Sequence, residues 1–105
     1  SQLQVVISGD IFELENKKNF FLENSVKKFV MLNVSAAFHS KYMKDAENIL
    51  SIDIEKLHFN ENKINIISNY SASPSYESLD IKKLLKKQMS NRVRWTESIK
   101  NLEKN

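Results

Sequence analysis

The sequence predicts an α/β fold, because short apolar runs rich in β-branched residues alternate with segments of helical periodicity. Strands are expected at residues 3–8 and 28–34, with a weak strand at 57–59 and a stronger one at 64–68. Helical segments separate these runs, and no hairpin signal joins neighbouring strands. The alternation therefore favours a sheet with at least partly parallel pairing.

The first strand and the first helix are marked by the residues at their ends. Gly9 and Asp10 stop the strand, and Asp10 is also placed to cap a helix over Ile11–Glu23. Asn24 is expected to end that helix in the left-handed conformation. The second strand then runs into a turn of small residues, Ser35–Ser40. These elements make a strand, helix, strand unit.

Three more helices are expected in the rest of the chain. Ser40 is placed to cap one over residues 41–51, and Ser78 is placed to cap another. The apolar positions of the Ser78 helix share one face: Ile81, Leu84, Leu85 and Met89. Its other face carries four lysines: Lys82, Lys83, Lys86 and Lys87. A last amphipathic helix is expected from about Arg92, with Trp95, Ile99 and Leu102 on its apolar side.

Composition excludes several kinds of site. The chain has 105 residues, one Gly, no Cys and a formal net charge of +3. The absence of Cys excludes disulfides and thiolate nucleophiles, and the histidines, His39 and His58, are too far apart in sequence to suggest a metal cluster. A single Gly excludes a Gly-rich phosphate loop and a Gly-x-Ser-x-Gly elbow. The lysines are scattered in pairs, so nucleic-acid binding is not expected.

Length and hydropathy indicate one small domain or a piece of a larger one. No apolar run approaches the ~20 residues of a membrane-spanning helix, and no signal-peptide pattern opens the chain. We therefore expect a cytoplasmic protein with no membrane partner.

His39 is the main candidate for a catalytic side chain. It follows a predicted strand end, in a turn of small residues, which is where α/β proteins gather catalytic groups. A structural or surface histidine is the alternative. His58 lies between apolar neighbours on an alternating segment, so it is expected to point to solvent without a role.

The other charged residues offer no obvious catalytic group. Three pairs of carboxylates lie two residues apart and would splay onto different faces of a helix: Glu13 and Glu15, Asp45 and Glu47, and Asp53 and Glu55. All six are expected to be solvated. The Lys82–Lys87 cluster is expected to be a solvated helix face, with an acidic partner or a phosphate as the alternative.

Four segments carry a resemblance to a known family. They are QVVISG (4–9), VSAAFHS (34–40) with Met43 after it, IISN (66–69), and KQ (87–88) followed by VRWTESI (93–99). In order and spacing they resemble the C-terminal part of malonyl-CoA:acyl-carrier-protein transacylases. The resemblance implies the C-terminal part of an α/β-hydrolase-like acyltransferase domain plus the second half of its ferredoxin-like subdomain. Residues 1–32 would belong to the subdomain and residues 33–105 to the acyltransferase core.

The resemblance also implies an activity, the transfer of malonyl from malonyl-CoA to acyl carrier protein in fatty acid biosynthesis, with no cofactor. His39 matches the family's catalytic histidine, which accepts the proton of a serine hydroxyl. Gln88 matches the position whose backbone carbonyl orients that histidine. Phe38 matches a position where malonyl-selective members carry Phe and methylmalonyl-selective members carry a smaller residue. An ordinary core role for Phe38 is the alternative.

Other parts of the family pattern match no segment of this chain. They are the Gly-His-Ser-type elbow of the nucleophile, the Gln of the oxyanion hole and the Arg that pairs with the malonyl carboxylate. Asn62, Asn65 and Arg92 stand where the family usually has prolines, which should destabilise the fold modestly. We therefore expect a chain that carries the histidine without the serine and is inactive alone.

The expected partners are acyl carrier protein, a coenzyme A thioester and the missing N-terminal part of the enzyme, with no nucleic acid. Two alternatives stay open. One is a non-catalytic remnant or a complementing subunit that binds the N-terminal part. The other is a small basic adaptor that acts through Lys82–Lys87.

Overall fold

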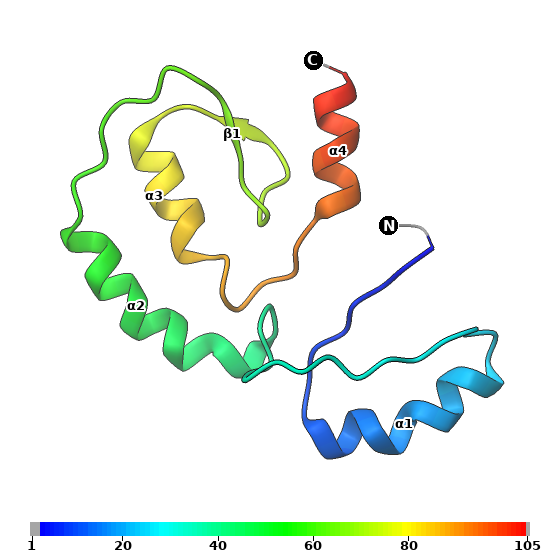
Figure 1. Cartoon of the computed structure of the whole chain (residues 1–105). Helices are drawn as coiled ribbons and strands as arrows, with labels where there is room; N and C mark the ends of the chain where they lie inside the picture. The colour runs from blue at the N-terminus through cyan, green and yellow to red at the C-terminus, as the bar shows by residue number, and fades with distance from the viewer. Residues whose placement is uncertain (1–2, 105) are drawn as a thin grey trace.

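The structure is a computed structural model that describes residues 3–104 of the chain. Its elements in chain order are α1 (Ile11–Glu23), the 3₁₀ helix η1 (Lys41–Met43), α2 (Lys44–Lys56), β1 (Ile66–Ile67), β2 (Pro74–Ser75), α3 (Ser78–Lys86) and α4 (Trp95–Glu103). Figure 1 shows α2 and α3 side by side, whereas α1 lies apart from them with an extended segment on either side.

The predicted first helix is confirmed, with α1 covering Ile11–Glu23. The Asp10 carboxylate caps it by accepting from the backbone N–H groups of Phe12 (2.9 Å) and Glu13 (3.1 Å). The predicted left-handed Asn24 is wrong, because Asn24 has φ −106° and the next residue, Ser25, has φ 71°. The Asn24 side chain instead donates to the carbonyl of Phe20 at 2.8 Å, which satisfies a helix-end carbonyl without a left-handed backbone.

The later helices are present with shifted ends. Ser40 caps η1 as predicted, accepting from the N–H of Tyr42 at 3.3 Å, and the helix that follows continues to Lys56. The predicted cap at Ser78 is wrong, because Ser78 is the first residue of α3 and Glu77 precedes it. Helix α3 ends at Lys86, so Met89 lies in the turn beyond it. Helix α4 begins at Trp95, three residues later than Arg92.

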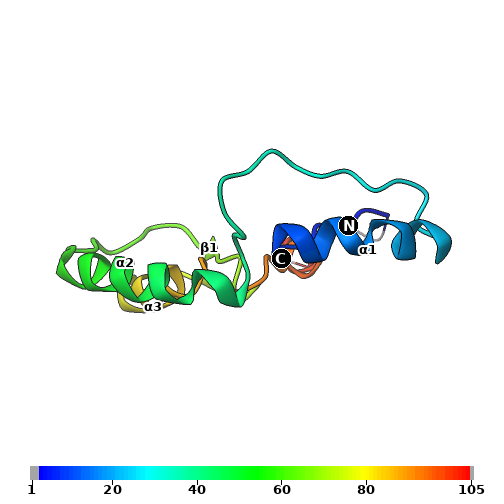
Figure 2. The same ribbon diagram turned by 90° about the horizontal axis from the view of Figure 1, so that it is seen from below.

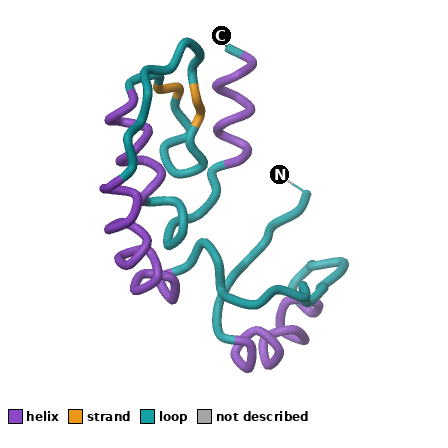
Figure 3. The backbone as a smooth tube through the Cα atoms, turned by 60° about the vertical axis from the view of Figure 1, so that its left-hand side comes forward, coloured by secondary structure: helices purple, strands orange, loops and turns teal. Residues whose placement is uncertain are grey.

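The predicted strands are mostly wrong. Within residues 64–68 a strand forms only at β1, which pairs with β2 in the antiparallel sense, Ile66 opposite Ser75 and Ile67 opposite Pro74. Figure 3 shows this short pair in orange and the other predicted strands, 3–8, 28–34 and 57–59, as loop. An extended segment becomes a strand only when a neighbour accepts and donates its backbone hydrogen bonds. Parallel pairing is therefore also wrong for the part of the chain that the structure describes.

The chain forms a flat and open body with little apolar core. Its radius of gyration is 16.7 Å, against about 13 Å for a compact domain of this length, and its extents are 49 × 36 × 17 Å (Figure 2). Among the described residues the buried apolar side chains are Ile54 and Ala72, whereas Val5 is 80% exposed. In the same range no helix is both long and apolar enough to cross a bilayer. Polar contacts must therefore hold much of the fold together.

One such contact joins the C-terminus of α2 to α3. Lys82 is only 15% exposed and donates to the carbonyls of Glu55 (2.5 Å) and Leu57 (3.2 Å), where the helix dipole favours a cation. Lys86 pairs with the carboxylate of Glu55, and this hydrogen bond together with the charge of Lys82 lowers the pKa of Glu55. The expectation that the whole lysine face is solvated is therefore wrong. The expectation holds for Lys83, which is 76% exposed.

Lys82 and Lys83 offer a matched test of this contact. We expect Lys82→Met to lower the free energy of unfolding by about 1–2 kcal/mol, because two carbonyls at the end of α2 lose a charged donor. Lys83→Met should change it by less than about 0.5 kcal/mol. Urea denaturation followed by circular dichroism measures both, and equal effects of the two variants would contradict the assignment.

Candidate active site

His39 stands in the turn that leads into η1, with its backbone in an unusual conformation. Its φ is 62°, in the left-handed region that non-glycine residues seldom adopt. Its N–H donates to the carbonyl of Met89 at 3.0 Å, and Ser40 closes the turn by donating from Oγ to the carbonyl of Ala37 at 2.6 Å. A conformation of this kind persists where surrounding contacts determine it, and such residues cluster at functional sites.

The ring of His39 faces two backbone carbonyls. Its Nδ1 atom lies 2.9 Å from the oxygen of Gln88 and 3.2 Å from the oxygen of Asn91. Because a carbonyl can only accept, Nδ1 carries the hydrogen and donates, which leaves a lone pair on Nε2 when the ring is neutral. The structure thus brings together His39 and Gln88, the pair that the resemblance singled out. Sequence reasoning did not suggest Asn91.

The two carbonyls belong to a turn, residues 87–91, that directly follows the C-terminus of α3. The last carbonyls of a helix lack partners within it and carry the negative end of its dipole. Gln88 and Asn91 lie just beyond that end. The turn can therefore orient the ring of His39.

A buried carboxylate on α2 holds this turn in place. Glu47 is 3% exposed, and its Oε2 atom accepts from the N–H (2.9 Å) and the Oγ–H (2.6 Å) of Ser90. Lys44 donates to its Oε1 atom at 2.7 Å. The expectation that Glu47 is solvated is therefore wrong. The sequence carries one sign of this burial. Glu47 lies four residues after Met43 and seven before Ile54, and these spacings place it on the apolar face of its helix.

Glu47 is ionised despite its burial. Burial is the largest single influence and by itself raises the pKa of the carboxyl group. Hydrogen bonds from Lys44 and from the side chain and backbone of Ser90 outweigh it, with help from the charge of Lys44, and the net pKa lies below the ordinary value for a glutamate. The pair of Glu47 and Ser90 is therefore a charge-assisted contact at neutral pH.

A second contact braces the same turn from the side of β1. The amide of Asn69 donates from Nδ2 to Oε1 of Gln88 at 3.1 Å, and the carbonyl of Asn69 accepts from the N–H of Arg94 at 2.9 Å. Between β1 and α3 lies a largely apolar hollow of about 270 Å³, lined by Ile66, Ile67, Ser68, Asn69, Ile81, Leu84, Leu85 and Gln88. Gln88 therefore meets His39 through its backbone and borders this hollow.

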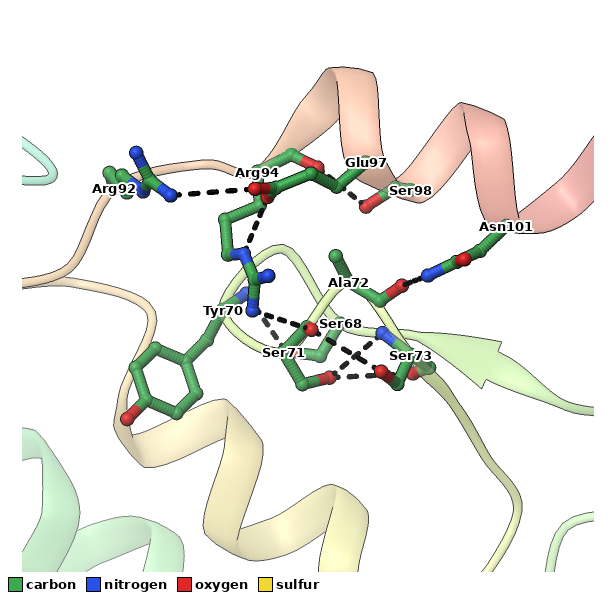
Figure 4. Close-up of polar contacts among 10 residues, drawn as sticks. All are labelled: Ser68, Tyr70, Ser71, Ala72, Ser73, Arg92, Arg94, Glu97, Ser98 and Asn101. Atoms are coloured by element: carbon green, nitrogen blue, oxygen red, sulfur yellow. Dashed lines mark hydrogen bonds and ion pairs between the residues drawn. The ribbon is translucent and has the colours of Figure 1, made fainter.

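The loop after β1 is tied to α4 by the polar network in Figure 4. Arg94 donates from Nη1 to the carbonyl of Ser71 at 2.8 Å and pairs through Nε with Glu97. Asn101 donates to the carbonyl of Ala72, a buried residue with φ 57°. The ring of Tyr70 points away from this network (Figure 4). The network fixes the loop against α4, the helix that comes after residues 87–91 in the chain.

Phe38 and His58, the other two side chains weighed in the sequence, lie at the surface. Phe38 is 42% exposed in the part of the chain that the structure describes. His58 is exposed and lies in a loop rather than on a strand. Among residues 3–104 no group of three His, Asp or Glu side chains gathers as metal ligands would.

The ionised Glu47 predicts a pH-dependent stability. Its folded pKa is lowered, so its contribution to stability is present above the ordinary pKa of a glutamate and is lost as the pH falls through the lower, folded value. Glu47→Gln should cost about 2 kcal/mol of unfolding free energy at pH 7 and less at pH 3. Urea denaturation at both pH values measures the difference, and an equal cost at both would show that Glu47 is not ionised in this contact.

Known proteins resemble this chain over nearly all of its length, although no protein-family profile matches it. It is 44% identical over 99 residues to the polyketide biosynthesis protein PksE of Bacillus subtilis (strain 168), which covers 92% of this chain and 13% of PksE. It is 41% identical over 100 residues to the polyketide biosynthesis malonyl CoA-acyl carrier protein transacylase BaeC of Bacillus velezensis, covering 94% of this chain and 34% of BaeC. The chain thus spans about a third of BaeC and a smaller share of PksE.

The fold agrees with the sequence. The crystal structure of the malonyl-CoA:ACP transacylase of Synechocystis sp. PCC 6803 matches with a TM-score of 0.81 and 32% identity, over 91% of this chain and 32% of that one. This match confirms the predicted fold class, the C-terminal part of an α/β acyltransferase domain. By sequence and by fold, the chain resembles malonyl-CoA:acyl-carrier-protein transacylases, and it spans about a third of BaeC and of the Synechocystis enzyme.

Proposed function

We propose that this chain supplies the general base of a malonyl-CoA:acyl-carrier-protein malonyltransferase and that His39 is that base. The observation that carries the proposal is the Nδ1 contact with the carbonyls of Gln88 (2.9 Å) and Asn91 (3.2 Å). A ring held in this way has its Nε2 lone pair available to a hydroxyl group. The nucleophilic serine comes from a segment outside this chain.

The proposed reaction has two symmetrical halves. In the first, Nε2 of His39 takes the serine proton while the serine oxygen attacks the thioester carbonyl of malonyl-CoA, and the imidazolium then protonates the departing thiolate of coenzyme A. In the second, Nε2 takes the proton of the phosphopantetheine thiol of acyl carrier protein, whose sulfur attacks the seryl ester, and the imidazolium returns a proton to the serine oxygen. The facing carbonyls stabilise the imidazolium in both halves, and no cofactor is needed.

The acceptor and the pathway are part of the proposal. The names of PksE and BaeC refer to polyketide biosynthesis, and that of BaeC to acyl carrier protein. We therefore extend the fatty acid assignment to malonyl supply for either kind of chain extension, with an acyl carrier protein as the acceptor.

We also propose the division of the chain into residues 1–32, part of a ferredoxin-like subdomain, and residues 33–105, part of the acyltransferase core. The separation of α1 from α2 and α3 in Figure 1 supports this division. The accessible surface is 8743 Å², whereas a compact monomer of this mass exposes about 6,100 Å². This excess supports a complementing role, in which the chain binds the part of the enzyme that carries the serine.

His39 and His58 allow a matched test of the proposed base. The chain alone should transfer no malonyl from malonyl-CoA to acyl carrier protein, and its mixture with the N-terminal part of BaeC, expressed separately, should do so. His39→Ala should lower the rate of the mixture by about 10²–10⁴-fold, because the serine loses its base. His58→Ala should leave it unchanged. Mass spectrometry of the carrier protein measures the transfer.

Two results would contradict the proposal. One is a mixture with His39→Ala that transfers malonyl as fast as the wild type, because His39 would then not be the base. The other is turnover by the chain alone that His39→Ala abolishes, which would show that no external serine is required. If the two parts form no complex, the complementing role is wrong.

Phe38 is proposed to limit the size of the acyl group. Phe38→Ser should raise the rate with methylmalonyl-CoA relative to malonyl-CoA by about 10–100-fold, because a smaller side chain leaves room for the extra methyl group. Phe20→Ser, at an exposed position on α1, is the control and should leave the ratio unchanged. Competition between the two thioesters in the mixture measures the ratio. An unchanged ratio in Phe38→Ser would place the selectivity elsewhere.

A further inference from the structure

Residues 87–91, the turn whose carbonyls bond to His39, are themselves held by Glu47. We propose that Glu47 and Ser90 are positioning residues for His39, which fix the turn so that its carbonyls select the Nδ1–H form of the ring. The inference rests on the proposed role of His39 as a base. It adds two residues that touch neither the ring nor a substrate.

The contacts place Ser90 at the centre of the turn. The carbonyls of the residues on either side of Ser90 bond to His39. Those of Gln88 and Asn91 face Nδ1 of the ring, and that of Met89 accepts from the backbone N–H. Ser90 itself bonds to Glu47, because both its N–H (2.9 Å) and its Oγ–H (2.6 Å) donate to one oxygen of that carboxylate. A displacement of Ser90 would therefore move the three carbonyls together.

Glu47 and His39 belong to one continuous segment, which consists of the turn Ser35–Ser40, η1 and α2. This segment holds residues 87–91 at two points, through the ring of His39 and, eight residues later, through the carboxylate of Glu47. Together the contacts form a closed loop, which runs from His39 through residues 87–91 to Ser90, from Ser90 to Glu47, and from Glu47 back along α2 and η1 to His39. Such closure fixes the imidazole relative to the carbonyls within the small tolerance that proton transfer needs.

The carboxylate is built for this task rather than for solvent contact. Lys44 occupies its other oxygen at 2.7 Å, so that both oxygens are bonded and the charge is compensated in a site that is 3% exposed. Removing one partner of a buried charged contact leaves the other unsatisfied. Loss of either Glu47 or Ser90 should therefore loosen the turn.

The ring tautomer reports the position of the turn directly. A neutral histidine in water favours the proton on Nε2, so that a dominant Nδ1–H form requires acceptors held at Nδ1. Long-range ¹H–¹⁵N correlation spectra of the ¹⁵N-labelled 105-residue chain at pH 8 distinguish the two forms. The wild type should show His39 mainly as the Nδ1–H form. Glu47→Gln and Ser90→Ala should each shift the tautomer ratio toward Nε2–H by about fivefold, and Ser90→Thr, which keeps the hydroxyl group, should restore it.

Glu55→Gln is the matched control. Glu55 also lies on α2 and also pairs across to α3, through Lys82 and Lys86, but its partners lie outside the turn. The variant should leave the tautomer ratio unchanged. An equal shift in Glu55→Gln would show a general loosening and overturn the proposal, as would an unchanged ratio in Ser90→Ala. Loss of the folded spectrum in Ser90→Ala would also overturn it, because the contact would then support the fold rather than position the ring.

The test separates this inference from the proposed function. A wild-type chain with His39 in the Nε2–H form overturns the positioning role, whatever the transfer assay gives. A dominant Nδ1–H form that depends on Glu47 and Ser90, together with a reconstituted mixture that transfers no malonyl, would leave the positioning contact standing and refute the proposed reaction.

Discussion

Two backbone carbonyls converge on the Nδ1 atom of His39, and carbonyls accept hydrogen bonds without being able to donate them. This constraint sets the tautomer of the ring without a carboxylate in the role that aspartate has in a serine triad. The two carbonyls lie in the turn that follows α3, at the negative end of the dipole of this helix. The geometry of the site therefore depends on how residues 87–91 are held, which is the role of Glu47 on one side and Asn69 on the other.

The rest of the chain shows why such polar contacts matter. Among the described residues few apolar side chains are buried, so the arrangement of helices cannot be ascribed to a large core. Charged groups join the elements instead, Lys82 across the end of α2 and Arg94 across the loop before β2. The exposed apolar residues along the extended segments are suited to burial against another protein surface. The body itself is flat (Figure 2). His39 lies where polar contacts join the segment of η1 and α2 to residues 87–91.

Local signals in the sequence predicted the helices better than the strands. The cap at Asp10 and the cap at Ser40 act between residues two or three apart, so their outcome is decided within the segment itself. The runs 3–8 and 28–34 have strand composition, but a strand also requires a partner, and they pair with none in the part of the chain that the structure describes. The contact between His39 and Gln88 spans 49 residues and came from the family resemblance, because no local pattern encodes it. Glu47 was misread because charge favours exposure, although its spacing from Met43 and Ile54 placed it on the apolar side.

The central claim is that this chain supplies the histidine of a catalytic pair of serine and histidine. Nδ1 of His39 bonds to residues 87–91, and Nε2 is left to face the serine. A crystal structure of the chain in complex with the N-terminal part of a relative such as BaeC tests it most directly. The account predicts Nδ1 at hydrogen-bond distance from the carbonyls of Gln88 and Asn91, and Nε2 within about 3 Å of the oxygen of the nucleophilic serine. A ring turned so that Nε2 faces the carbonyls, or a different base beside that serine, would contradict it.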